Sequence, residues 1–269
     1  YGNKFIQKID MRGYGIGDGY QNIVITVNGR RLNNVDMVPQ LLGSISPSSI
    51  ESIEIVKSSG IVIGGDGANA GVINIRTKKS NTKEITVYAG SDKLLDGSFY
   101  IGHSDDKLSV SVSAQKQTSE VIRKLNTNTP KDENTLATGS FNLAYLVTDK
   151  LDIRLGASAT NTDAVYAGNL TKAQYENNPK QEGSSTTIQE YDTKSIELGT
   201  SYYLNNETSI NVDAYKENKE SQTNYVTYSS LSKANYDYKS VKTNIDYASQ
   251  NLSLKAGYDF NDSQRETTT

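Results

Sequence analysis

Beyond Lys79 the sequence alternates between apolar and polar residues, and this period of two constrains the fold more than any other feature. In "LDIRLGASAT" the apolar positions from Leu151 to Ala159 alternate with polar ones that include Asp152 and Arg154. Such alternation is typical of a strand with two unlike faces. Because charged side chains occupy mid-strand positions, the polar face is easier to explain with a water-filled lumen than with a dry core.

The alternation marks nine strand-like segments, and the connections between them differ in length in a regular way. The segments are 84–91, 96–104, 107–117, 138–147, 151–161, 191–204, 207–220, 234–247 and 251–260. Four connections are short, at 105–106, 148–150, 205–206 and 248–250, and three are long and polar, at 118–137, 162–190 and 221–233. Short turns on one side and long loops on the other are typical of outer-membrane barrels. The sequence therefore predicts an antiparallel membrane β-barrel, partial, with about nine strands visible; a soluble β-sandwich or solenoid is the alternative.

Composition agrees with a barrel and excludes several other classes of protein. Only 35% of the residues are apolar, and the mean hydropathy is −0.59, which suits a chain with a polar lumen and loops in water. The net charge of −3 offers no basic surface for nucleic acid. The chain has no cysteine, so disulfides and cysteine metal sites are excluded. No apolar run approaches the roughly 20 residues of a membrane-spanning helix.

The first 79 residues follow a different pattern, typical of a small α+β unit. "NIVITVNGRRL" is a β-branched run that ends at Asn28-Gly29, a strong signal for a tight turn between strands. Pro39 is placed to open a short helix at 40–42, and Pro47 a second turn. "IESIEIV" and "GVINIRTK" are two further strands, separated by a glycine-rich segment. We therefore divide the chain into an N-terminal unit at 1–79 and barrel strands at 80–269.

Within this N-terminal unit, "DMRGYGIGDGYQNIVITVNGRRLNN" and then "ISPSSIESIEIVKSSGIVIGGDGANAGVINIRTKK" resemble the plug domain of TonB-dependent outer-membrane receptors. The matching positions are Arg12, Gly13, residues 29–33, Ile45, Pro47, Ile50, Glu51, residues 53–56, Gly64, Ala68, residues 71–75, Thr77 and Lys78. The sequence departs from the family pattern where Lys57, Ser58 and Ser59 replace the usual Arg-Gly-Pro, Ile63 a Tyr, and Ala70 a Gly. The strands beyond residue 79 match the family by architecture and not by motif.

The resemblance implies a receptor of the bacterial outer membrane that imports a scarce nutrient such as a ferric siderophore, haem or cobalamin. It implies three partners: a TonB-type energy-transducing protein in the periplasm, outer-membrane lipid and a small nutrient ligand. The plug positions expected to bind substrate are Tyr14, Asn33, Asn34, Asp36, Met37, Ile61, Val62 and Ile63. Those expected to contact the barrel are Arg12, Arg30, Arg31, Glu51, Glu54 and Lys57. Such polar contacts are individually weak, so force from a periplasmic partner would rearrange them.

Two alternative functions stay open at this point. One is a ligand-binding or signalling receptor without transport. The other is a truncated barrel that serves as a structural subunit of an envelope assembly with further partners, because nine strands cannot close a plugged barrel of about 22. The chain shows no TonB box before the plug and no terminal aromatic strand, and we expect it to be the N-terminal portion of a longer receptor.

Signals for an enzyme or a cofactor are weak. Gly13, Gly15 and the next glycines have the spacing of a dinucleotide loop, but a strand follows them where such a loop requires a helix. His103 is the single histidine, too few for a zinc site or a catalytic triad. The carboxylates Asp105 and Asp106 lie in an expected exposed turn, where nothing would raise a pKa for acid–base work. We expect no enzyme activity, no metal and no cofactor.

Overall fold

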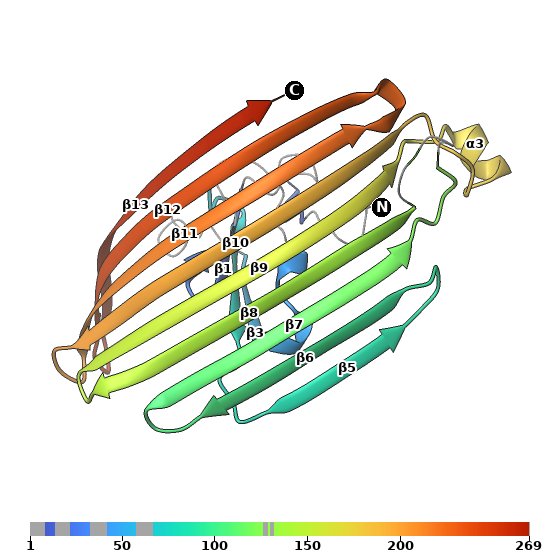
Figure 1. Cartoon of the computed structure of the whole chain (residues 1–269). Coiled ribbons are helices and arrows are strands. Elements are labelled where there is room, and N and C mark those ends of the chain that lie inside the picture. The colour runs from blue at the N-terminus through green and yellow to red at the C-terminus, as the bar shows by residue number, and fades with distance from the viewer. Residues whose placement is uncertain are drawn as a thin grey trace.

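Two β-sheets organise the chain in the computed structural model, which describes residues 9–13, 22–32, 42–57, 67–125, 129 and 132–268. A four-stranded sheet has the order β2-β1-β4-β3, and a nine-stranded sheet runs from β13 to β5 in sequence order. The larger sheet curves around the smaller one, which lies against its concave side (Figure 1). We call the nine strands β5–β13 the wall, and the elements before them the N-terminal unit.

The small sheet is built around two parallel strands, β1 (Ile23–Val27) and β4 (Gly71–Thr77). The edges are antiparallel: β2 (Arg30–Arg31) pairs with β1, and β3 (Ile50–Val56) pairs with β4. All five residues of β1 are buried, as expected of a central strand covered on both faces. The predicted short helices are the 3-10 turns η2 (Leu42–Ser44) and η3 (Pro47–Ser49). Of the expected helix at 40–42, only Leu42 lies within the described residues.

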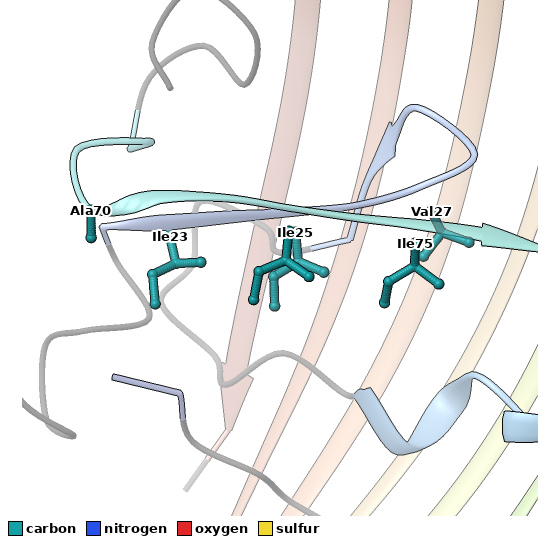
Figure 2. Close-up of a cluster of buried hydrophobic side chains, with 6 residues drawn as sticks. Ile23, Ile25, Val27, Ala70 and Ile75 are labelled. Atoms are coloured by element: carbon teal, nitrogen blue, oxygen red, sulfur yellow. The ribbon is translucent and has the colours of Figure 1, made fainter. Parts of the chain in front are cut away.

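The core of the N-terminal unit lies on one face of β1 and β4. Figure 2 shows these side chains pointing to the same side of the two strands. The buried members are Ile23, Ile25, Val27, Ala70, Ile73 and Ile75, with Leu42, Ile45 and Ile50 packed against them. Each large aliphatic side chain that leaves water here contributes about 1.5–3 kcal/mol. The apolar sequence of these two strands therefore forms a small core made of residues of the N-terminal unit.

The predicted turn at Asn28-Gly29 is present and fixes the direction of the β1–β2 hairpin. Asn28 and Gly29 have φ of 53° and 86°, the positive values that a two-residue type I′ turn requires at both positions. The Asn28 side chain donates to Thr77 Oγ1 (2.8 Å) and accepts from the Thr77 backbone N–H (3.0 Å). The turn is thereby tied to the end of β4, and Arg30 leaves it in a defined direction.

The wall contains the nine antiparallel strands that the alternation predicts, each paired with its neighbours in sequence. They are β5 (Lys83–Ala89), β6 (Leu95–Ser104), β7 (Leu108–Glu120), β8 (Glu133–Thr148), β9 (Leu151–Ala167), β10 (Thr186–Tyr203), β11 (Thr208–Tyr225), β12 (Ser230–Ala248) and β13 (Ser253–Thr268). The partial antiparallel barrel with an N-terminal α+β plug is thus confirmed. Within the described residues, no helix has the length and apolar character needed to cross a membrane.

Several strands extend well beyond the predicted ends, and one predicted loop is wrong. The expected long loop at 221–233 is strand on both sides of the single turn η4 (Val226–Tyr228), where Ser229 adopts a φ of 49°. The apolar alternation stops where strands leave the lipid, but the backbone ladder continues, so a pattern based on lipid contact underestimates strand length. The connection after β9 also contains the short helix α3 (Lys172–Asn177), capped by Thr171 and Gln174.

The two faces of the wall differ as the alternation requires. Glu197 of β10 contacts the N-terminal unit, so its neighbours Ile196 and Leu198 point to the opposite face. These two side chains are 54% and 59% exposed. Large apolar residues on the same outward face of other strands are similarly exposed, including Ile101, Val112, Val212, Val241 and Phe260. The outer face is thus apolar, as a surface in contact with lipid must be.

Gly71, at the start of β4, offers a test of the small sheet. Its φ is +151°, and a Cβ there would collide with the backbone carbonyl of Val56. We expect Gly71→Ala to destabilise the sheet by about 1–3 kcal/mol, measured as faster amide exchange in β3 and β4 of the intact protein. Gly97→Ala is the matched control, since a Cβ at Gly97 meets nothing within 4 Å. Equal exchange rates in the two variants would contradict this role for Gly71.

Candidate functional site between the N-terminal unit and the wall

Arg30 connects the N-terminal unit to the inner face of the wall. Its Nε lies 3.4 Å from Oε2 of Glu197 in β10, and its guanidinium stacks 4.4 Å from the ring centroid of Tyr215 in β11. Both charged side chains are largely withdrawn from water, at 18% and 26% exposure. Because Arg30 directly follows the type I′ turn, the hairpin geometry aims its side chain across the interface.

A second charged cluster, around Arg154, lies on the wall near this ion pair. Arg154, Arg30 and Glu197 line one cavity between the N-terminal unit and the wall. Arg154 of β9 donates to Asp152 (2.6 Å), Ser201 (2.6 Å) and Asp213 (2.8 Å). Gly199 leaves the space for it, because a Cβ there would collide with Asp213 and approach the Arg154 guanidinium. Charge-assisted bonds of this kind are stronger than neutral ones, so the wall holds its side of the interface in a fixed arrangement.

The cavity beside Arg30 has a volume of about 610 Å³ and is lined by both partners. Arg30 and Arg31 contribute from the hairpin, and polar or charged side chains of β9–β13 contribute from the wall. Cations and carboxylates are mixed along this lining, including Lys242 and Asp246. Water that fills such a space competes for each polar contact between the N-terminal unit and the wall. The interface therefore consists of separate polar interactions and not of a continuous apolar core.

Away from Arg154 and Glu197, the inner face of β7–β10 presents hydroxyl groups to the N-terminal unit. Thr138 Oγ1 donates to the backbone carbonyl of Ser44 in η2 (2.7 Å) and shares a hydrogen bond with Thr160 (2.9 Å). Further along the inner face, Ser113 pairs with Ser140 (2.8 Å) and Ser158 with Ser195 (2.7 Å). A neutral hydrogen bond contributes only about 0.5–1.5 kcal/mol net. This hydroxyl belt therefore contacts the unit without holding it strongly.

The link between the two sheets is fixed separately, at Lys78. The hydroxyl of Tyr100 in β6 donates to the Lys78 backbone carbonyl (2.9 Å), and Lys78 Nζ lies 2.7 Å from Glu84 of β5. Tyr100 is almost fully buried, at 1% exposure. The chain thus leaves the small sheet at a point anchored to the first two wall strands.

Comparison with known proteins identifies the two parts. The TonB-dependent Receptor Plug Domain model matches residues 1–72. Residues 1–72 are thus a TonB-dependent receptor plug domain. Over 80 residues the chain is 34% identical to the ferric aerobactin receptor of Klebsiella pneumoniae. The matched stretch makes up 30% of this chain and 11% of that receptor. Members of the TonB-dependent receptor family are bacterial outer-membrane proteins.

Solved receptors of this family show the same arrangement of plug and strands. The ferric yersiniabactin uptake receptor FyuA from Yersinia pestis superposes with a TM-score of 0.79 over 98% of this chain and 43% of its own, at 15% identity. The ferric citrate transporter FecA superposes with the same TM-score over 99% and 43%, at 14% identity. The chain thus spans less than half of the length of these receptors. At such identities the likeness concerns the fold alone.

The six plug residues that were predicted to contact the barrel lie in different surroundings in the structure. Arg30 contacts the wall, and Arg31 lines the shared cavity beside it. Arg12 donates to the Asn69 carbonyl (3.3 Å), and Glu54 accepts from Asn74 (3.3 Å), both within the plug. The other two are Glu51, which lines a shallow hollow on the plug, and Lys57, which is exposed. The eight predicted substrate-binding residues, from Tyr14 to Ile63, lie outside the described residues.

The wall residues of this interface were not singled out from the sequence. Glu197, Asp213 and Tyr215 sit on the polar faces of alternating strands, and only their mid-strand position distinguishes them. A charged residue in the middle of a membrane-spanning strand is expensive unless it faces the lumen and finds a partner. That signal points to Arg154 and Glu197, but it leaves the plug residue they meet undetermined.

The described residues offer little chemistry beyond binding. They contain no group of three histidine or acidic side chains that could hold a metal. His103 lies at an exposed turn, 3.4 Å from Asp105. The backbone N–H groups of Lys107 and Leu108 hold the pKa of Asp105 below its usual range, so this carboxylate caps a turn. The relatives are transport receptors and not enzymes.

Removing Arg30 should loosen the plug. We expect Arg30→Ala to leave Glu197 without its plug partner, and a double-mutant cycle with Glu197→Gln to give a coupling of about 1–2 kcal/mol. The measurement is urea unfolding of the plug in the full-length receptor in detergent, followed by amide exchange in β1 and β4. Lys57→Ala, which removes an exposed plug cation, is the control. A coupling near zero would show that the ion pair does not hold the plug.

Proposed function

We propose that this chain is the plug and the first wall strands of a receptor that imports a scarce nutrient, with the plug gating the barrel. The observation that carries the proposal is the interface: among the described residues, the plug meets the lumen face through the Arg30–Glu197 ion pair and the Thr138–Ser44 hydrogen bond, beside a cavity lined by both parts. These contacts are separate and polar, and water in the cavity beside them competes for each one. They suit a part that must stay closed at rest and yet rearrange under force.

A ferric siderophore is the nutrient class that the relatives favour. The names of the similar proteins refer to ferric aerobactin, ferric yersiniabactin and ferric citrate. Haem and cobalamin belong to the same proposal as other scarce nutrients. We keep Tyr14, Asn33, Asn34, Asp36, Met37 and residues 61–63 as the proposed substrate contacts, and 1–79 and 80–269 as the proposed domains.

The direction of the plug strands supports this placement of the substrate contacts. β4 ends at Thr77 and leads within a few residues to β5, which starts beside the short-turn end of the wall. The start of β4 therefore lies about 20 Å away, the length of a seven-residue strand, toward the long loops. In barrels of this kind the long loops face the cell exterior. The segment with Ile61 and Val62 precedes this end of β4 in the sequence.

Energy for movement would come from a TonB-type partner in the periplasm. Pulling on the N-terminal segment loads the described contacts one after another, because the hairpin with Arg30 and the turn η2 touch different strands of the wall. The anchor at Lys78 keeps the plug attached to β5 and β6. A path thus opens along the cavity beside β9–β13 while the chain stays tethered.

An engineered tether tests the gating role directly. Cysteines at Ser44 and Thr138 in the full-length receptor would link plug to wall, because the Thr138 hydroxyl already reaches the Ser44 carbonyl. We expect the oxidised form to bind ferric aerobactin, ferric yersiniabactin or ferric citrate as before, and to lose uptake of ⁵⁵Fe at least about tenfold. Reduction should restore uptake, since the bridge alone blocks the movement of the plug.

The matched control is a bridge within the wall. The side-chain hydroxyl oxygens of Ser113 in β7 and Ser140 in β8 lie 2.8 Å apart, so cysteines at these two positions should form a disulfide. We expect this bridge to leave uptake unchanged. Full uptake through a receptor with a complete bridge between residues 44 and 138 would contradict gating by the plug. Binding of a ferric complex without uptake in any form, even with an energised membrane, would indicate a receptor that does not transport.

A further inference from the structure

Lumen-facing side chains of β10–β12 form three successive rows that begin at the two wall residues touched by Arg30. On facing strands the rows are Glu197–Tyr215, then Glu217–Tyr238, then Lys219–Tyr236. Alternate residues of a strand point to the same face, so the three β11 members all face the lumen. Because β11 starts at a short turn, each row lies about 7 Å farther from the short turns than the row before it.

Tyr215 joins the first row to the second. Its ring centroid lies 4.4 Å from the guanidinium carbon of Arg30, and its hydroxyl donates to Oε2 of Glu217. One side chain thus holds the plug cation with its ring and a wall carboxylate with its hydroxyl. A cation gains from an aromatic ring only while it stays over the face of that ring. The hydrogen bond that fixes the ring therefore also fixes the position in which Arg30 is held.

Lys219 forms the third row and is the other partner of Glu217. Its Nζ lies 3.8 Å from Glu217 Oε1 and over the parallel rings of Tyr236 and Tyr238, at 5.9 and 5.5 Å from their centroids. The charged side chains of Lys219 and Glu217 are each only 6% exposed. Removing one member of a buried ion pair leaves the charge of the other uncompensated. The position of the Glu217 carboxylate therefore depends on Lys219.

We propose that Tyr215 and Glu217 couple the hold on Arg30 to Lys219, which makes Lys219 a positioning residue for the plug although it lies two rows beyond the contact. Glu217 divides its two carboxylate oxygens between the Tyr215 hydroxyl and the Lys219 ammonium. When the ammonium is lost, the carboxylate turns to its other partner and moves the Tyr215 ring from beneath Arg30. By linkage, departure of Arg30 weakens the Lys219–Glu217 pair by the same factor.

This coupling has the opposite sign to the direct effect of one cation on the other. Arg30 and Lys219 carry like charges, so direct repulsion makes the loss of either one favourable for the other. Coupling through Tyr215 and Glu217 makes the loss of either one unfavourable. A double-mutant cycle separates the two cases, because it measures the sign as well as the size of the interaction. The coupling rests on the proposed role of Arg30 in holding a plug that gates the barrel.

A cycle of Arg30→Ala and Lys219→Met in the full-length receptor in detergent tests the coupling. Methionine keeps an unbranched side chain at this position and removes the charge. The measurement is the ratio of folded to unfolded plug in urea, followed by amide exchange in β1 and β4. We expect Lys219→Met to lower this ratio on the order of fivefold when Arg30 is present, and to change it by less than about twofold in the Arg30→Ala background. Lys219→Arg, which keeps the charge, should behave as the wild type.

Tyr215→Phe is the second variant, because it keeps the ring beneath Arg30 and removes only the hydroxyl that reaches Glu217. In this background Lys219→Met should no longer change the ratio. Lys242→Met is the matched control: Lys242 lines the cavity beside Arg30, but it pairs with Asp259 at 3.9 Å. Its effect on the ratio should be the same with and without Arg30.

An effect of Lys219→Met that is equal with and without Arg30, or with and without the Tyr215 hydroxyl, overturns the proposal. A ratio that rises in Lys219→Met also overturns it, since direct repulsion alone predicts a rise. Either result leaves the gating role of the plug intact, because Arg30→Ala by itself still loosens the plug. If Arg30→Ala by itself leaves the ratio unchanged, the hold by Arg30 is refuted, and the coupling with it.

Discussion

The structure depends on one constraint: a chain that crosses lipid must pair all of its backbone N–H and C=O groups. The wall meets it from β6 to β12, where each strand pairs on both sides, whereas β5 and β13 are each paired on one side in the described sheet. This pairing forces side chains to alternate between lipid and lumen. A polar inner face follows directly, and a folded unit placed against it can be held only by polar contacts.

The plug must be stably folded and yet only loosely attached to the wall. Its apolar cluster around Ile23, Ile25 and Ile73 is made of residues of the plug itself. Its attachment comes from Arg30 and from the Thr138–Ser44 hydrogen bond. Since core and attachment use different residues, the attachment can change without loss of the fold. This separation is the physical basis of the proposed gating.

The sequence predicted the elements best where local chemistry decides them. The turn at Asn28-Gly29 and the alternation around Leu151 follow from backbone sterics and from lipid contact, which act within a few residues. The upper parts of β11 and β12 were not predicted because their outward faces are mostly polar there, so the apolar positions that mark a lipid-facing strand are missing. The partners of Arg30 were not predicted for another reason. Glu197 is far from Arg30 in the sequence, and only the arrangement of the two sheets brings the two side chains together.

Single-molecule pulling on the N-terminus of the full-length receptor in a bilayer would test the central claim most directly, that plug and wall are separable folding units joined by weak contacts. The account predicts an extension that begins in the plug at low force, stops at the Lys78 anchor and leaves β5–β13 intact. Extraction of β5 and β6 together with the plug, in a single step, would contradict it.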